Sequence, residues 1–187
     1  ESDDFIVEDM YLTLYETAKQ YKLDSVKSNF CRFTGEGKER VFAKGYLISE
    51  KKYYGKVLNP SQDPNLLKAN NVNPPGLYST EFIRKNHIRL NETPGASFQD
   101  NGLWFQIFTQ SERMYFLPQF FYMIRRDNPN SSVKDRSKVY CSCDEYDFIR
   151  NFIEKSEELK ERFAPYCALY RYNNYCFTLN GIAGEHK

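Results

Sequence analysis

Asp100 has a position in the sequence that suits a general base. It stands with Asn101 directly before an apolar pattern of helical spacing, which consists of Leu103, Trp104, Ile107 and Phe108. The pattern predicts a helix that begins at Asp100. The unpaired backbone N–H groups and the dipole at such a start stabilise an ionised carboxylate, which could accept a proton at neutral pH. Taken alone, a carboxylate at this position is more often a simple N-cap.

Arg125 and Arg126 form a second group with chemical potential. They follow an aromatic, largely apolar run from Arg113 to Ile124 and precede a loop of turn-forming residues, 127–132. Two guanidinium groups beside such a loop suit a phosphate-bearing ligand, although a solvated strand end is the commoner role of an arginine pair. The run predicts one or two buried strands, in which Pro118 marks a strand start, an edge or a bulge.

The chain opens with the acidic residues Glu1, Asp3 and Asp4. Two carboxylates at i and i+2 can face a hard cation together, because Mg²⁺ and Mn²⁺ prefer carboxylate oxygens and bridge to diphosphate. Without further support, acidic residues at a terminus indicate only a solvated end.

The order of several short motifs resembles the C-terminal half of bacterial family 2 glycosyltransferases. The motifs are Leu77-Tyr78 with Phe82-Ile83, Ile88 to Glu92, Gln99-Asp100, and Tyr122 with Arg125, Asn128 and Ser131. The resemblance covers most of residues 1–155. It implies the α/β class and the C-terminal portion of a GT-A type fold, a short mixed sheet flanked by helices, with a helical C-terminal tail.

The same resemblance implies an enzyme that transfers a sugar, with inversion, from a nucleotide-diphosphate donor to a glycan or lipid-linked acceptor. Asp100 would be the general base, and Asp3 would bind Mg²⁺ or Mn²⁺. The other implied site residues are Gln99 and Trp104 on the acceptor side, and Glu1, Arg125 and Arg126 at the donor and its phosphates. The family usually has Asp where this chain has Glu1. We expect such an enzyme to act in the biosynthesis of cell-envelope polysaccharide.

A nucleotide-binding half precedes the acidic motif in this family, so the resemblance implies that the chain is a fragment, inactive by itself. We expect residues 1–135 to form the acceptor-side half of the enzyme domain, and residues 136–187 a helical extension packed on it. An apolar face that the other half would cover should then be exposed, and self-association through it is expected.

Composition narrows the range of partners. The 187 residues are 41% hydrophobic and 17% aromatic, enough to bury a sizeable core. Lys and Arg number 26 against 25 Asp and Glu, so nothing in the charge predicts a nucleic-acid partner.

No apolar run approaches the roughly 20 residues that span a bilayer, and we expect a cytoplasmic location or the inner face of the membrane. The alternative function is a non-catalytic glycan-binding or protein-interaction module.

Patterning predicts the remaining elements. The five cysteines are an odd number without zinc-finger spacing, which indicates free thiols. His87 lies in a turn, where a solvated helix end is a simpler role than catalysis. The expected elements are a helix at Asp9–Lys22, strands at Val26–Phe33 (one face buried) and Arg40–Ser49, a mobile loop at Ser61–Pro75, a capped helix at Thr80–Asn86, and a helical tail with a new segment starting at Pro165.

The implied missing half leads to a first prediction. Calorimetric titration of this chain with uridine and guanosine diphosphates plus Mn²⁺ should show weak or absent binding, because the family's donor site depends on the preceding strands and helices. Micromolar binding, about −8 kcal/mol, would contradict the expectation and put the donor site within these residues.

Overall fold

A computed structural model describes residues 3–93, 98–128 and 140–181 of the chain. Its contacts divide the chain into two compact units, which we call the sheet unit (Glu1–His87 and Gln110–Asn128) and the helical unit (Ile88–Thr109 and Pro129–Lys187). The sequence predicted a single division of the chain, at residue 135, whereas each of these units combines two segments that are separate in the sequence.

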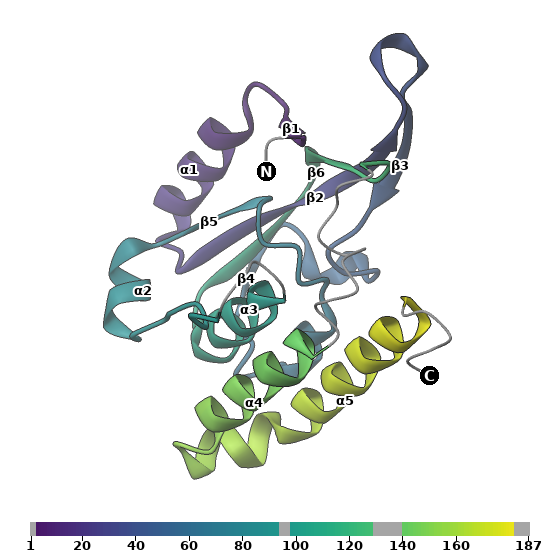
Figure 1. Cartoon of the computed structure of the whole chain (residues 1–187). Coiled ribbons are helices and arrows are strands. Elements are labelled where there is room, and N and C mark those ends of the chain that lie inside the picture. The colour runs from purple at the N-terminus through teal and green to yellow at the C-terminus, as the bar shows by residue number, and fades with distance from the viewer. Residues whose placement is uncertain (1–2, 94–97, 129–139, 182–187) are drawn as a thin grey trace. The chain divides into compact units, whose positions relative to one another are not determined.

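The sheet unit contains a six-stranded mixed sheet (Figure 1). Its strands are β1 (Phe5–Ile6), β2 (Ser25–Thr34), β3 (Val41–Gly45), β4 (Val57–Leu58), β5 (Gly76–Tyr78) and β6 (Met114–Arg125). The main order is β1-β6-β2-β3, with β4 paired to β6 and β5 paired to β2. Strands β2 and β6 run parallel, and the other strand pairs are antiparallel.

Strand β2 is buried on both faces, which corrects the expectation of one buried face. It lies between β6 and β3, and its residues 25–31 are all buried, including the polar Ser25, Lys27, Ser28 and Asn29. The alternation of polar and apolar residues suggested a solvated face, but these polar side chains find partners inside the protein. The buried Lys27 ammonium, for example, donates hydrogen bonds to the Val72 carbonyl and the Tyr78 hydroxyl.

Pro118 interrupts the pairing of β2 with β6, as the sequence predicted for a bulge. The register shifts on both sides of Asn29, between Leu117 and Tyr122 of the partner strand. The Asn29 side chain fills the irregularity: its amide nitrogen donates to the Pro118 carbonyl at 3.0 Å. Its amide oxygen accepts from the Leu47 N–H at 2.9 Å and from the Tyr54 hydroxyl at 2.8 Å.

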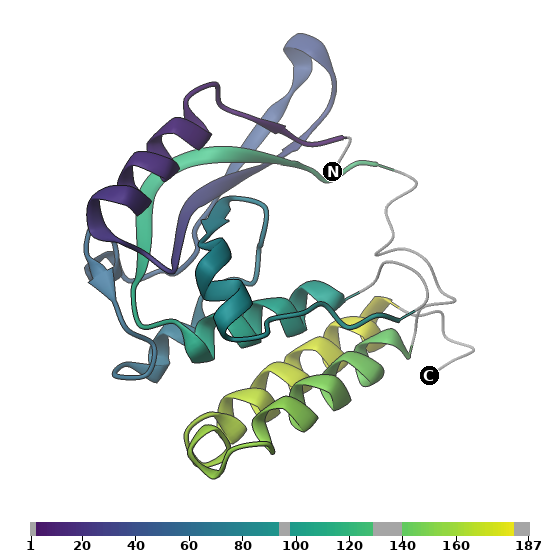
Figure 2. The ribbon, with the colours of Figure 1, turned by 90° about the vertical axis from the view of Figure 1, so that its left-hand side faces the viewer.

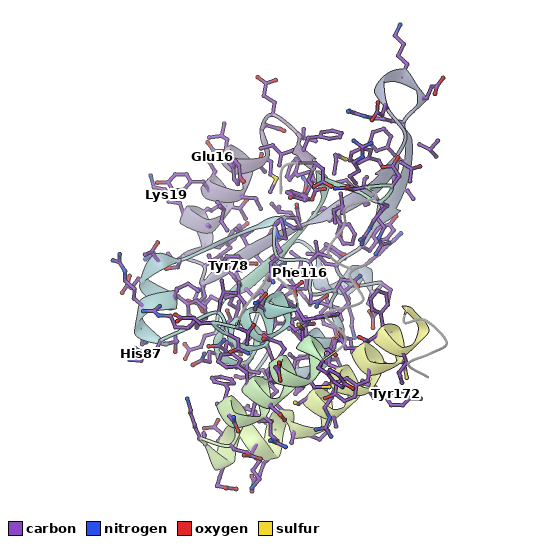
Figure 3. The ribbon with its side chains drawn as sticks, viewed as in Figure 1. Glu16, Lys19, Tyr78, His87, Phe116 and Tyr172 are labelled. Carbon is purple, nitrogen blue, oxygen red and sulfur yellow. The ribbon has the colours of Figure 1, made fainter. Side chains whose placement is uncertain are left out.

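Helix α1 (Met10–Tyr21) confirms the helix predicted from the period of its apolar residues. Met10 and Leu14 are fully buried, and they share an apolar core with residues of β2 and β6. Glu16 and Lys19 stand on the exposed side of the helix (Figure 3). Met10 and Leu14 therefore mark the side of α1 that packs against the sheet, whereas the apolar Leu12 and Tyr15 are exposed.

The segment Ser61–Pro75 is not the loosely held loop that its Asn and Pro content suggested. It contains a 3-10 helix, η3 (Pro64–Lys68), whose first turn is capped by the Asp63 side chain. Leu66 and Leu67 are buried almost completely. This apolar pair anchors the segment, so burial outweighed its turn-forming composition. Two further short 3-10 helices, η1 and η2, cover Gly37–Glu39 and Lys51–Tyr53.

Helix α2 (Thr80–Lys85) confirms the predicted capped helix. The Ser79 hydroxyl accepts a hydrogen bond from the Phe82 N–H at 3.2 Å. His87 follows in the left-handed region, with φ 51°, and is exposed, as expected for a solvated helix end.

The helical unit is built from α3 (Gln99–Gln110, whose last residue falls in the sheet unit), α4 (Cys141–Ile153) and α5 (Glu157–Gly181). Helices α4 and α5 lie side by side (Figure 2). Contrary to the prediction, Pro165 lies inside α5. Phe163 and Cys167 are buried on either side of it, and this packing compensates for the backbone hydrogen bond that proline cannot make.

The mixed α/β architecture, with a mixed sheet flanked by helices, confirms the predicted fold class. Among the residues that the structure describes, no helix is both long enough and apolar enough to cross a membrane.

The Asn29 cluster yields a stability prediction. Asn29→Ala should lower the free energy of unfolding by about 2 kcal/mol, because the buried Leu47 N–H loses its acceptor. Asn65→Ala is the matched control: this side chain is exposed and should change stability by less than about 0.5 kcal/mol. Urea unfolding measures both, and equal losses would contradict a structural role for the cluster.

Candidate active site

One group of predicted site residues gathers where β2 and β6 end. Because these strands are parallel, their carboxyl ends meet at the same edge, where ligands commonly bind in α/β proteins. The antiparallel strand β1 begins beside this edge and brings Asp3 and Asp4 to it. Asp3 accepts a hydrogen bond from the Asn128 amide at 2.7 Å, and Asp4 accepts one from the Arg125 backbone N–H at 2.8 Å.

The Arg125 guanidinium is held by two carboxylates of the sheet unit. It forms ion pairs with Asp127 at 2.8 Å and with Glu36 at 3.1 Å, and both raise its pKa. Asp127 also accepts a hydrogen bond from the Gly35 N–H, and this bond and Arg125 lower the pKa of the Asp127 carboxyl. These contacts join the end of β6 to the turn after β2 and leave Arg125 less available to a phosphate.

Arg126 has a different environment from its neighbour. Its backbone N–H donates to the Phe33 carbonyl at 2.9 Å, which fixes it beside the end of β2. Partial desolvation and then repulsion from Arg32 lower the pKa of Arg126, and attraction to Asp4 partly offsets them. Two neighbouring guanidinium groups repel one another, and an anion placed between them would relieve that repulsion.

A divalent cation at this edge would take most of its coordinating oxygens from substrate phosphates and water, because the protein offers few. Within residues 3–93, 98–128 and 140–181, no three His, Cys, Asp or Glu side chains cluster as a ready-made metal site. Asp3 with the neighbouring Asn128 can supply one or two oxygens. This small donor set fits Mg²⁺ or Mn²⁺ bound through substrate phosphates and water, the usual arrangement for Mg²⁺. Glu1 and Ser131 lie outside the described residues.

In the helical unit, Asp100 is the second residue of α3 and is exposed. It therefore lies inside the first helical turn, whereas the N-cap reading placed it just before the helix. The predicted helix start was correct within one residue. The positive end of the helix still favours the ionised carboxylate at this position.

The two residues predicted beside the acceptor differ in accessibility. The Gln99 amide nitrogen donates to the Thr93 hydroxyl at 2.9 Å, and its side chain is half-buried. Trp104 is only 2% exposed, with its ring 4.6 Å from Phe108 and 4.8 Å from Tyr170 between centroids. The Trp104 indole is a packing residue in this structure, which argues against the predicted contact with an acceptor.

Glu145 of α4 is a residue that the sequence analysis missed. Among the described residues it is the one buried carboxylate, with 1% of its surface exposed. One of its oxygens accepts from the Gly102 N–H at 2.7 Å, and the other from the Asn91 amide at 3.1 Å. Burial is the main cause that raises the pKa of Glu145, with a smaller contribution from the charge of Asp100.

Gly102 was the available sequence signal for this contact. A glycine inside a helix is unfavourable relative to alanine, by about 1 kcal/mol, and often marks a close approach of another group. Here a Cβ at position 102 would collide with the Glu145 carboxylate and lie 3.0 Å from the Phe148 ring. The glycine thus leaves the space into which the carboxylate fits.

No protein-family model and no curated protein sequence matches this chain. Its structure is similar to the crystal structure of S. aureus TarS 1–349, with a TM-score of 0.50 and 12% identity over 87% of this chain and 44% of that one. TarS is a glycosyltransferase. This chain has a glycosyltransferase-like fold.

Two further crystal structures of TarS 1–349 align over the same 87% of the chain at 13% identity. The complex with UDP has a TM-score of 0.49, and the complex with UDP-GlcNAc has a TM-score of 0.48. They cover 45% and 47% of the TarS chains, so this chain spans less than half the length of the structures it matches.

The buried position of Glu145 predicts a pH-dependent stability difference. Its folded pKa lies above the ordinary value near 4.5, so its contribution to stability is complete at lower pH and is lost as the pH rises through the folded pKa. Glu145→Gln does not titrate. The stability of the Gln variant relative to the original protein should therefore improve from pH 4.5 to pH 7.5, as measured by urea unfolding at both pH values. A difference independent of pH would contradict the raised pKa.

Proposed function

We propose that this chain contributes the acceptor-side part and the catalytic base of an inverting glycosyltransferase of the GT-A class, family 2. The observation that carries the proposal is the fold shared with the glycosyltransferase TarS over 87% of the chain. The order of the motifs around Asp100 and Arg125 supports the finer family assignment. The activity is proposed for the full natural protein that carries these residues, because the match covers less than half of TarS 1–349.

Asp100 is the proposed general base. The exposed carboxylate lies in the first turn of α3, where the helix dipole favours its ionised form. It would take the proton from an acceptor hydroxyl as that oxygen attacks the anomeric carbon of the donor. The bond from that carbon to the diphosphate oxygen breaks on the opposite side, so the nucleoside diphosphate leaves with the bonding electrons and the sugar configuration inverts.

The edge formed by β2 and β6 is proposed to receive the diphosphate. Arg126 is the better candidate of the arginine pair, because Glu36 and Asp127 already bind Arg125. Asp3, with Asn128 beside it, would hold Mg²⁺ or Mn²⁺. When bound, the cation would offset the charge that develops on the leaving diphosphate. The acceptor would be a glycan or a lipid-linked saccharide.

Asp100→Asn provides the central test. In the full natural protein, turnover of a nucleotide sugar should fall by on the order of 100- to 10,000-fold, because the amide cannot accept the proton. Release of UDP from UDP-GlcNAc, the ligand named in a TarS structure, is the first assay, with Mn²⁺ and saccharide acceptors. Thermal midpoints should change little, because the substitution removes at most about 1 kcal/mol of charge–dipole interaction.

Asp144→Asn is the matched control. Asp144 is also an exposed acidic residue in the first turn of a helix of the same unit, so this variant loses the same type of charge. It should keep normal turnover. If Asp100→Asn is as active as this control, Asp100 is not the base. Saccharide binding without transfer of any nucleotide sugar would favour the alternative, a non-catalytic glycan-binding module.

A further inference from the structure

Glu145 makes contacts that reach the helix turn carrying Asp100. Its carboxylate is buried between α4 and the start of α3, and each of its oxygens accepts an N–H hydrogen bond. A buried carboxylate is costly unless such partners satisfy it. Glutamate at this position therefore calls for an explanation beyond apolar packing between helices.

The contact with Gly102 restrains the first turn of α3. Backbone N–H groups in the first turn of a helix lack the usual partner four residues earlier, and Gly102 lies at the end of that turn. Its N–H donates to Glu145 at 2.7 Å, while the Asn101 N–H donates to the Phe98 carbonyl at 2.9 Å. Asp100 lies within the turn that the Asn101–Phe98 bond closes, two residues before Gly102.

A second set of contacts ties the segment before α3 to the same place. Asn91 donates its side-chain amide to the other oxygen of Glu145 at 3.1 Å. The Gln106 side chain bonds to both backbone groups of Arg89, donating to the carbonyl at 2.7 Å and accepting from the N–H at 3.3 Å. The buried Glu145 carboxylate thus joins Asn91 to the start of α3, and Gln106 of the same helix holds Arg89 beside it.

We propose that Glu145 is a positioning residue for Asp100: by accepting the Gly102 N–H, it holds the first turn of α3 so that the Asp100 carboxylate meets the acceptor hydroxyl. This inference rests on the proposed function. The carboxylates are close enough for the charge of Asp100 to contribute to the raised pKa of Glu145. Their separate roles follow from exposure, since Asp100 is exposed and Glu145 is buried.

Glu145→Ala and Glu145→Gln separate positioning from charge. Alanine removes the acceptor of the Gly102 N–H, so kcat in the full natural protein should fall by on the order of 100-fold, the usual effect of misplacing a catalytic group by about 1 Å. KM should stay unchanged, because Glu145 is buried and its two oxygens are bonded to Asn91 and Gly102. Glutamine keeps an oxygen at the same reach and should retain nearly normal kcat.

Ile149→Ala controls for loss of stability. Ile149 lies on the buried side of the same helix, 1% exposed, and its truncation weakens packing without removing the acceptor of the Gly102 N–H. This variant should keep its kcat at temperatures below its unfolding transition. Hydrogen–deuterium exchange of this chain adds a readout independent of catalysis: the Gly102 amide should exchange faster in Glu145→Ala, and remain protected in Glu145→Gln.

Several results would overturn the proposal. Normal kcat in Glu145→Ala would do so, as would equal losses in the Ala and Gln variants, or a loss in Ile149→Ala as large as in Glu145→Ala. Unchanged exchange at Gly102 in Glu145→Ala would show that the hydrogen bond does not hold the turn. If Asp100→Asn is inactive while Glu145→Ala is active, only this inference fails. If Asp100→Asn is active, the proposed base fails, and the positioning role fails with it.

Discussion

Strand β2 can lie parallel to β6 only if the chain between them crosses from one end of the sheet to the other. This crossover contains β3, β4, β5, α2 and α3. The parallel pairing also makes both strands end at one edge, where β1 brings in Asp3 and Asp4. The pairing, rather than the local sequence, therefore places Arg126 in the candidate phosphate site, where its backbone N–H bonds to the Phe33 carbonyl.

The central position of β2 explains the unusual polarity of the sheet interior. A strand covered on both faces must satisfy each polar side chain internally, and Lys27 and Asn29 do so through carbonyls, an N–H and hydroxyl groups. These bonds reach Val72 and Leu47, which lie in irregular segments without strand pairing of their own. The buried polar residues of β2 therefore help to order the long crossover, whose composition alone would favour loops.

Local patterns predicted the elements whose stability is local. The helical period identified α1 and α3, the Ser79 cap identified α2, and the aromatic run with Pro118 identified β6 and its irregularity. The failures came where tertiary burial outweighed local preference. The polar residues of β2 suggested a solvated face, the Asn- and Pro-rich segment concealed the buried pair Leu66-Leu67, and packing on both sides of Pro165 allowed α5 to continue.

The residues of the candidate site show the same contrast between local patterns and tertiary burial. The order of motifs pointed to Asp100 and the arginines, because these residues lie within recognisable local patterns. Glu145 lies 43 residues from Gly102 and 54 from Asn91, in the helical tail, for which the sequence predicted only packing. The only hint in the sequence was Gly102 itself. Glycine destabilises a helix interior relative to alanine, so its presence there suggests that another group occupies the space of a Cβ. A base exposed to substrate cannot be held by burial of its own side chain. Its position must come from the backbone that carries it, and a buried carboxylate accepting an N–H of that backbone is one physical means of fixing it.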